Sequence, residues 1–216
     1  MNKYKLVMFD MDGTLLNGKG IFVIAEKLGF YDELLKFFTN VKVHQHYYKK
    51  SIEIAKLCKG FKKDEFINIF HNVPLQDNVE NIIKNLKKKN IKIAIATDSY
   101  MFLAEDLKNR LKIDFAFANN LLTNNGTITG DIEINNKNLI SDITGNIYSI
   151  CKEQTLTDLC KKLGISVNDS IAVGDGIVDI GMIKIAGIGI AFNAFDKVNK
   201  YADIVTNDLN IILDYI

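Results

Sequence analysis

The stretch Lys5 to Thr14, KLVMFDMDGT, constrains the fold of this 216-residue chain more than any other. Its apolar run, LVMF, predicts a buried strand, because parallel strands covered on both faces are continuous apolar runs. Asp10 follows the run directly, and Asp12 comes two residues later. Ligands of open parallel sheets bind beyond the carboxyl ends of the strands, so we expect Asp10 to act there as a nucleophile and Mg²⁺ ligand. Asp12, one step around the turn, could carry protons to and from the reacting oxygens. The alternative is an ordinary Asp-Gly turn without catalysis.

Strands and helices alternate along much of the remaining chain, which predicts crossover units and a parallel sheet. Short apolar runs predict further strands at 91–96, 114–118, 170–173, 187–192 and 202–205. Asn125-Gly126 lies between strand-forming residues and predicts a hairpin. From Gly20 to about Val73 apolar residues recur at helical spacing, which predicts a small cap of helices. We therefore predict a doubly wound, Rossmann-like α/β core domain (1–16 and 77–216) with a helical cap domain (17–76) inserted after the first strand.

Polar residues follow three of the predicted strands, at Asp10, Thr97 and Asp175. Asp175 could complete a Mg²⁺ site opposite Asp10, and Asp179 lies within reach if a helix begins there. The alternative for this second cluster is a helix N-terminus that favours acidic residues. The Thr97 hydroxyl suits a phosphate oxygen. A basic group is also needed to balance the phosphate, and Lys152 is the best candidate. Its rivals by position are Lys137, Lys161 and Lys162.

The motifs together resemble those of the haloacid dehalogenase (HAD) superfamily. DMDGT, an apolar strand ending in Thr, a Lys and GDGIVD stand in the order of the four motifs of its phosphatases. FAFANNLL, TGDIE and IAVGDG with AGIGIAF resemble the core of the phosphoserine phosphatases, so the similarity covers residues 4–19 and 77–216. The resemblance implies that Asp10 is the nucleophile, Asp12 the acid/base and Lys152 the catalytic lysine. It implies phosphate and substrate binding at Thr97, Asp98, Ser99 and Lys152. It implies Mg²⁺ at Asp10, Asp12 (through its main-chain carbonyl), Asp175 and Asp179.

Several positions depart from the phosphoserine phosphatase pattern. Thr97-Asp98-Ser99 stands where Ser-Gly-Gly is usual, and Val178 stands where Asn is usual. Lys19 replaces an acid that would hold the amino group of serine, and residues 20–73 contain no arginine to hold its carboxylate. We therefore expect a Mg²⁺-dependent phosphomonoesterase that acts on a small phosphorylated metabolite through an aspartyl phosphate, with phosphoserine doubtful. A phosphotransferase or mutase with the same intermediate, and a catalytically silent binding module, are the alternatives.

Composition excludes other classes of protein. The charges nearly cancel at net +1, so no overall field indicates nucleic acid or a membrane as a partner. Three widely spaced cysteines are neither a disulfide framework nor a zinc pattern, which favours the cytoplasm. The N-terminal residues lead straight into the first strand and predict no signal peptide. In the predicted cap, His44 and His46 are expected at ordinary polar positions rather than as a metal pair. Lys19, His44, His46, Tyr47 and Tyr48 are candidates for the pocket lining, and the oligomeric state is left open.

Overall fold

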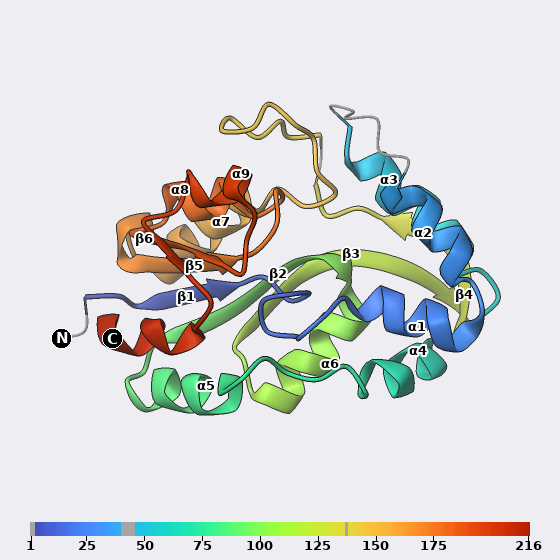
Figure 1. The fold of residues 1–216 in the computed structure, drawn as a ribbon, viewed down its shortest axis with the longest axis horizontal. Coiled ribbons are helices and arrows are strands. Elements are labelled where there is room, and N and C mark those ends of the chain that lie inside the picture. The colour runs from blue at the N-terminus through green and yellow to red at the C-terminus, as the bar shows by residue number, and fades with distance from the viewer. Residues whose placement is uncertain (1–2, 40–45, 137) are drawn as a thin grey trace.

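The computed structural model describes residues 3–39, 46–136 and 138–216, and it contains a seven-stranded sheet with the order β4-β3-β2-β1-β5-β6-β7 (Figure 1). All neighbours pair in parallel except β3 and β4, which are antiparallel. The strands are β1 (Leu6–Phe9), β2 (Lys92–Tyr100), β3 (Phe115–Asn124), β4 (Thr127–Glu133), β5 (Ser170–Gly174), β6 (Ile188–Phe192) and β7 (Ile204–Thr206). The predicted α/β fold is confirmed.

Helices cover both faces of the sheet, as Figure 1 shows. On one side lie α5 (Val79–Lys88), α6 (Met101–Leu111) and the 3-10 helix η2 (Leu209–Tyr215). On the other lie α7 (Lys152–Leu163), α8 (Ile180–Ile185) and α9 (Asp196–Asn199), and the 3-10 helix η1 (Val167–Asp169) precedes β5. Val7 and Phe9 of β1 belong to the apolar cluster that includes α5 and α6, whereas Leu6 and Met8 belong to the cluster under α7. Burial on both faces explains why the run LVMF has no polar residue.

Four helices lie between β1 and α5, at the place predicted for the cap: α1 (Gly20–Leu28), α2 (Tyr31–Thr39), α3 (Tyr48–Leu57) and α4 (Lys63–Phe70). They lie at one end of the sheet, beside the β3-β4 hairpin (Figure 1). The turn between α3 and α4 pairs with that hairpin, because the Gly60 N–H donates to the Ile128 carbonyl at 2.9 Å and the Ile128 N–H donates to the Phe61 carbonyl at 2.8 Å. Buried side chains of α3, α4 and the hairpin form part of one apolar cluster with the sheet.

Several predicted boundaries differ from the structure. The expected short strand at 114–118 is the first half of β3, which continues to Asn124 and forms the hairpin directly. Asn125 and Gly126 both have positive φ, 48° and 75°, so the predicted Asn-Gly turn is confirmed. The last strand begins at Ile204 rather than at Ala202. Strand β2 runs on to Tyr100, but its pairing with β3 is irregular between Ala96 and Tyr100, so Thr97 lies in an irregular part of the strand instead of at its end.

Among the described residues, no helix combines the length and the apolar character needed to cross a membrane. The three cysteines are buried and free.

Candidate active site

Asp10 directly follows β1, which lies between β2 and β5, at the edge of the sheet where β1 and β5 end. Phe9 pairs with Ile95 on one side and with Val173 on the other, so the three strands reach this edge at the same level. The Asp10 N–H donates to the Val173 carbonyl at 2.9 Å, which fixes the backbone just beyond β1. The residue is 5% exposed. The structure therefore places the predicted nucleophile at the position that the sequence predicted for it.

Asp12 lies in the turn that follows. The next residue, Gly13, has a φ of +95°, and a Cβ atom there would lie 2.6 Å from Asp175 Oδ2, so the turn requires glycine. Asp12 Oδ1 accepts a hydrogen bond of 2.6 Å from the N–H of Gly20, the first residue of α1. Burial, only partly offset by this hydrogen bond, raises the pKa of Asp12 to about 6. A carboxyl group with this pKa can hold and release a proton near neutral pH.

Lys152 joins two carboxylates in the interior. It is the first residue of α7 and only 2% exposed, and its Nζ lies 2.5 Å from Asp10 Oδ1 and 2.5 Å from Asp179 Oδ1. Burial disfavours its charge, but the two carboxylates outweigh that effect and raise the pKa of Lys152 above its ordinary value. The rivals Lys161 and Lys162 are exposed in the last turn of α7, and Lys137 lies outside the described residues. Of the three candidates that the structure describes, Lys152 is the one that contacts Asp10.

Asp10, Asp175 and Asp179 form a cluster in which one carboxylate oxygen of each lies within 4.8 Å of the others. Asp179 Oδ2 accepts from the N–H groups of Asp175 and Gly176, at 3.1 and 2.8 Å, so this side chain also holds the loop after β5. Burial, together with the charge of Asp179, raises the pKa of Asp175 to about 6. Like charges this close and this poorly solvated favour a bound cation, and hard carboxylate oxygens suit Mg²⁺. The side chain of Asp12 is not in the cluster, because it bonds to Gly20 instead.

The predicted phosphate-binding segment, Thr97 to Ser99, lies in the irregular part of β2. Thr97 is fully buried, and its Oγ1 accepts from the Ser99 N–H at 3.2 Å. Asp98 is exposed beside it. Asn119 of β3, which sequence reasoning missed, is also fully buried, and its Nδ2 donates to the Asp98 carbonyl at 2.7 Å and to Ser149 Oγ at 2.9 Å. This asparagine therefore connects the segment with the residues that precede Lys152.

Val178 has an apolar environment. It is half-buried and packs against the cluster that contains Leu159 and Met182, on the α7 side of the sheet. Packing therefore explains a valine at this position.

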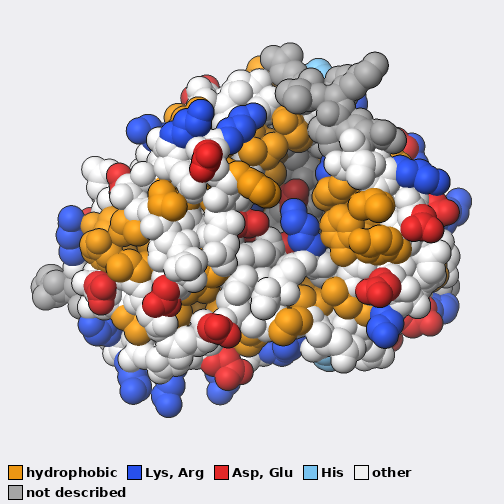
Figure 2. Space-filling view, viewed as in Figure 1, with side chains coloured by type: hydrophobic (Ala, Val, Ile, Leu, Met, Phe, Trp, Pro, Cys, Tyr) orange, Lys and Arg blue, Asp and Glu red, His pale blue; other side chains and the backbone are white. Residues whose placement is uncertain are grey.

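The predicted cap residues lie on more than one element. Lys19 immediately precedes α1 and is exposed. The Tyr47 ring lies 5.3 Å from the ring of Tyr148, and the His46 ring lies 5.7 Å from that of Tyr48. His44 falls outside the described residues. Figure 2 shows the surface hollowed between the α/β core and the helices of the cap, with acidic and basic side chains meeting in the hollow.

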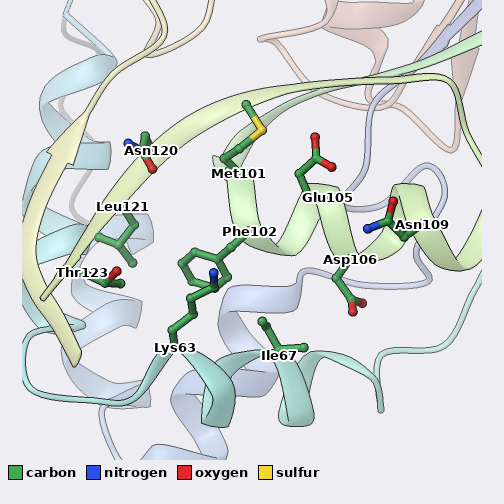
Figure 3. A pocket seen from close by; sticks show the side chains of 10 residues that line it. All are labelled: Lys63, Ile67, Met101, Phe102, Glu105, Asp106, Asn109, Asn120, Leu121 and Thr123. Carbon is green, nitrogen blue, oxygen red and sulfur yellow. The ribbon is translucent and has the colours of Figure 1, made fainter. Parts of the chain in front are cut away.

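A second hollow, of about 440 Å³, lies between α4, α6 and β3 (Figure 3). Its walls include Lys63, Phe102 and Asp106, and none of the predicted site residues lines it. The described residues that line it form no carboxylate cluster of the kind described above, so the edge of the sheet is the better candidate site.

Comparison with known proteins agrees with this location. The family model of the haloacid dehalogenase-like hydrolases matches residues 4–187, which include every residue of the site described above. The chain belongs to this family.

Curated relatives of this HAD hydrolase include two archaeal phosphoserine phosphatases. The Methanocaldococcus jannaschii protein is 32% identical over 99% of this chain and 98% of its own length. The Archaeoglobus fulgidus protein is 32% identical over 92% of this chain, which spans only 55% of that protein's length. A solved structure of a phospho-aspartyl intermediate analogue of phosphoserine phosphatase aligns with a TM-score of 0.83 at 30% identity, covering 99% of both chains. These matches confirm the predicted superfamily, the fold and the prediction of a phosphatase enzyme.

Proposed function

We propose that this HAD hydrolase is a Mg²⁺-dependent phosphomonoesterase that carries the phosphoryl group on Asp10 during the reaction. The observation that supports this most strongly is the buried contact between Lys152 and Asp10 at an edge where Asp12 and Asp175 also lie. A nucleophile, a proton carrier, a counter-charge and a cation site are thereby gathered around one point. Phosphoryl transfer needs little else, because positioning and charge stabilisation supply most of the acceleration.

In the first step, a carboxylate oxygen of Asp10 attacks phosphorus while the bond from phosphorus to the ester oxygen breaks. The leaving alcohol takes its proton from Asp12, whose pKa of about 6 keeps part of it protonated near neutral pH. In the second step, Asp12 takes a proton from water, and the water oxygen attacks the phosphorus of the aspartyl phosphate. Inorganic phosphate leaves and Asp10 is regenerated, so the two steps balance. Lys152 holds the Asp10 carboxylate and the transferred phosphate throughout.

The residues that would hold Mg²⁺ are Asp10, Asp175 and the main-chain carbonyl of Asp12. Asp179 would support the site, because its oxygens already serve Lys152 and two N–H groups. When bound, Mg²⁺ would offset the repulsion between the carboxylates and the phosphate. Thr97 and Ser99 offer hydroxyls to the phosphate oxygens.

The substrate is a small phosphorylated metabolite. The names of the relatives favour phosphoserine, and the fold supports a shared reaction. Lys19 and the lack of arginine in residues 20–73 argue against a serine site of the usual kind. The free, buried cysteines are consistent with the reducing cytoplasm as the compartment.

The test is phosphate release from a panel of phosphomonoesters that includes p-nitrophenyl phosphate and phosphoserine, measured with Mg²⁺, with EDTA and with Asp10→Asn. We expect Mg²⁺-dependent release that Asp10→Asn abolishes. Thermal unfolding gives an independent reading, because Mg²⁺ should raise the melting temperature of the native protein and not that of Asp175→Asn. Transfer of phosphate to an added alcohol in place of release would favour a phosphotransferase. Neither release nor transfer by a folded, Mg²⁺-binding protein would favour a silent module.

A further inference from the structure

Two lysines of the cap approach the same aromatic ring at the mouth of the site. Lys19 immediately precedes α1, Lys50 lies in the first turn of α3, and Phe38 belongs to α2. The Nζ atoms of Lys19 and Lys50 lie 5.9 and 3.2 Å from the centre of the Phe38 ring. Within the described part of the chain, neither ammonium group has a hydrogen-bond acceptor or a carboxylate at ion-pair distance. The ring contributes a cation-π attraction, but it neutralises neither charge.

The two lysines interact electrostatically with each other and with carboxylates of the candidate site. Although Lys19 is exposed at the surface, neighbouring atoms partly desolvate its ammonium group and disfavour its charge, but carboxylates led by Asp98 and Asp175 outweigh this effect and raise its pKa. The pKa of Lys50 is lowered to about 8 by burial and by the positive charge of Lys19, with Asp98 acting in the opposite direction. Lys19 therefore feels the negative charge of these carboxylates, and Lys50 feels the positive charge of Lys19. Lys50 is half-buried and carries a charge that the described residues only partly compensate.

We propose that Lys19 and Lys50 form an anion subsite that holds a second negatively charged group of the substrate, either a carboxylate or a phosphate. This inference rests on the proposed phosphomonoesterase function and narrows its substrates to small phosphate esters with two anionic groups. Two like charges that face a common space repel each other, and a bound anion would remove that repulsion while forming charge-assisted hydrogen bonds.

The position of the subsite relative to the reacting phosphate supports this. Lys19 is adjacent to Gly20, whose N–H binds the carboxylate of Asp12, so the subsite begins one residue away from the proton carrier. A short molecule could therefore contact both. An ester that carries an ammonium group in place of the anion would bring a third positive charge toward the two lysines, which disfavours its binding. The carboxylate of Asp98, which is exposed, raises the pKa of both lysines and so favours their charged forms.

The test is a matched series of two-carbon phosphate esters: 2-phosphoglycolate, ethane-1,2-diol bisphosphate, ethyl phosphate and ethanolamine phosphate. We expect kcat/KM for 2-phosphoglycolate and for ethane-1,2-diol bisphosphate to exceed kcat/KM for ethyl phosphate by at least about tenfold. Ethanolamine phosphate should have the lowest kcat/KM of the four esters. The first two esters also distinguish a carboxylate from a phosphate as the preferred anion.

In Lys50→Met the ratio of kcat/KM for 2-phosphoglycolate over ethyl phosphate should fall about tenfold. In Lys49→Met, an exposed neighbour on the same helix, the ratio should stay unchanged. A preference for ethanolamine phosphate, or equal ratios in the two variants, would overturn the inference.

A binding measurement separates this inference from the proposed function. Titration calorimetry with Mg²⁺ present should show that phosphonoacetate binds more tightly than methylphosphonate, and that Lys50→Met removes most of the difference. If no ester were hydrolysed, the phosphomonoesterase function would fail, while a preference for phosphonoacetate lost in Lys50→Met would still support the subsite. Equal affinity of the two phosphonates would overturn the subsite whatever the activity. Lys50→Gln serves as a second charge-removing variant if Lys50→Met does not fold.

Discussion

Replacing Lys152 with methionine tests whether the buried ion cluster holds the centre of the site together. Methionine keeps most of the volume and removes the charge. Lys152 Nζ lies 2.5 Å from a carboxylate oxygen of Asp10 and 2.5 Å from one of Asp179, and the three side chains are between 1% and 8% exposed. Removing one partner of a buried ion pair costs about 3–5 kcal/mol, because the charge that remains is uncompensated.

Proton uptake by Asp10 limits how much unfolding free energy Lys152→Met can lose. Burial raises the pKa of Asp10 and Lys152 lowers it, so the pKa rises further once the lysine is gone. An ordinary carboxyl pKa is about 3.9 and each unit is worth about 1.4 kcal/mol, so protonating Asp10 costs about 4 kcal/mol at pH 7 and about 1–2 kcal/mol at pH 5. The folded variant then binds more protons than the unfolded chain. Its stability therefore falls as the pH rises from about 4 toward the raised pKa, and recovers as the pH falls.

The assay is urea unfolding of the native protein and the variant in EDTA, at pH 5 and at pH 7. We expect Lys152→Met to lose about 3–4 kcal/mol of unfolding free energy at pH 7 and less than about 2 kcal/mol at pH 5. Lys161→Met, on the exposed last turn of the same helix, is the control and should stay within about 0.5 kcal/mol of the native protein at both values. A loss at pH 7 no larger than that of the control, or one that does not change with pH, would refute the reasoning.

Three further predictions concern other parts of the site. Gly174→Ala should destabilise the fold by about 1–3 kcal/mol in urea unfolding, because the new Cβ would lie 2.4 Å from Asp179 Cγ. Gly176→Ala, whose Cβ would meet Asp179 Oδ2 only at 3.4 Å, should cost less, and the reverse order would contradict this packing. Asp12→Asn should lower kcat/KM for ethyl phosphate by about 10²–10⁴-fold, and by less for p-nitrophenyl phosphate, whose leaving group needs no proton; equal losses would argue against a proton donor. Because burial and a neighbouring lysine lower the pKa of Lys50 to about 8, the kcat/KM preference for 2-phosphoglycolate over ethyl phosphate should decline as the pH rises through about 8. In Lys50→Arg that preference should persist to pH 9.5, and a decline as steep as in the native protein would assign the titration to another group.

The arrangement of the candidate site could be predicted from the sequence because each of its parts follows a local signal. An apolar run that stops at Asp10 indicates a strand end, and a second run that stops at Gly174-Asp175 indicates another. The parallel sheet then brings the two ends to one edge, since Phe9 and Val173 pair directly. No local signal identifies the lysine of the site, because four lysines are candidates by position. The order of the motifs, rather than geometry, favours Lys152.

The residues that the sequence did not indicate depend on contacts between distant segments. Asn119 is a polar residue within a strand, and nothing in FANN distinguishes it from its neighbour Asn120, which is exposed. Its role becomes visible only when β3 brings it against Asp98 and Ser149. Likewise, Lys50 belongs to a run of two lysines on a helix, and helical periodicity cannot tell which of them faces the site.

The attachment of the cap explains how such residues can change while the reaction centre stays the same. The α3-α4 turn is fixed to the hairpin by backbone hydrogen bonds and by the contact of Lys62 Nζ with Thr127 Oγ1 at 2.6 Å. At its other end, α3 is held by the Tyr48 N–H, which donates to the Ile147 carbonyl at 3.2 Å, five residues before Lys152. The helix that carries Lys50 is therefore positioned by the same core that positions Lys152. If the proposed subsite is correct, a substitution on its site-facing side should alter the substrate group that is bound without moving the groups proposed to act on phosphorus. We therefore expect the sequence differences from the phosphoserine phosphatases around Lys19 to reflect a different substrate. Comparing esters that carry an amine with esters that carry a second anion tests this expectation.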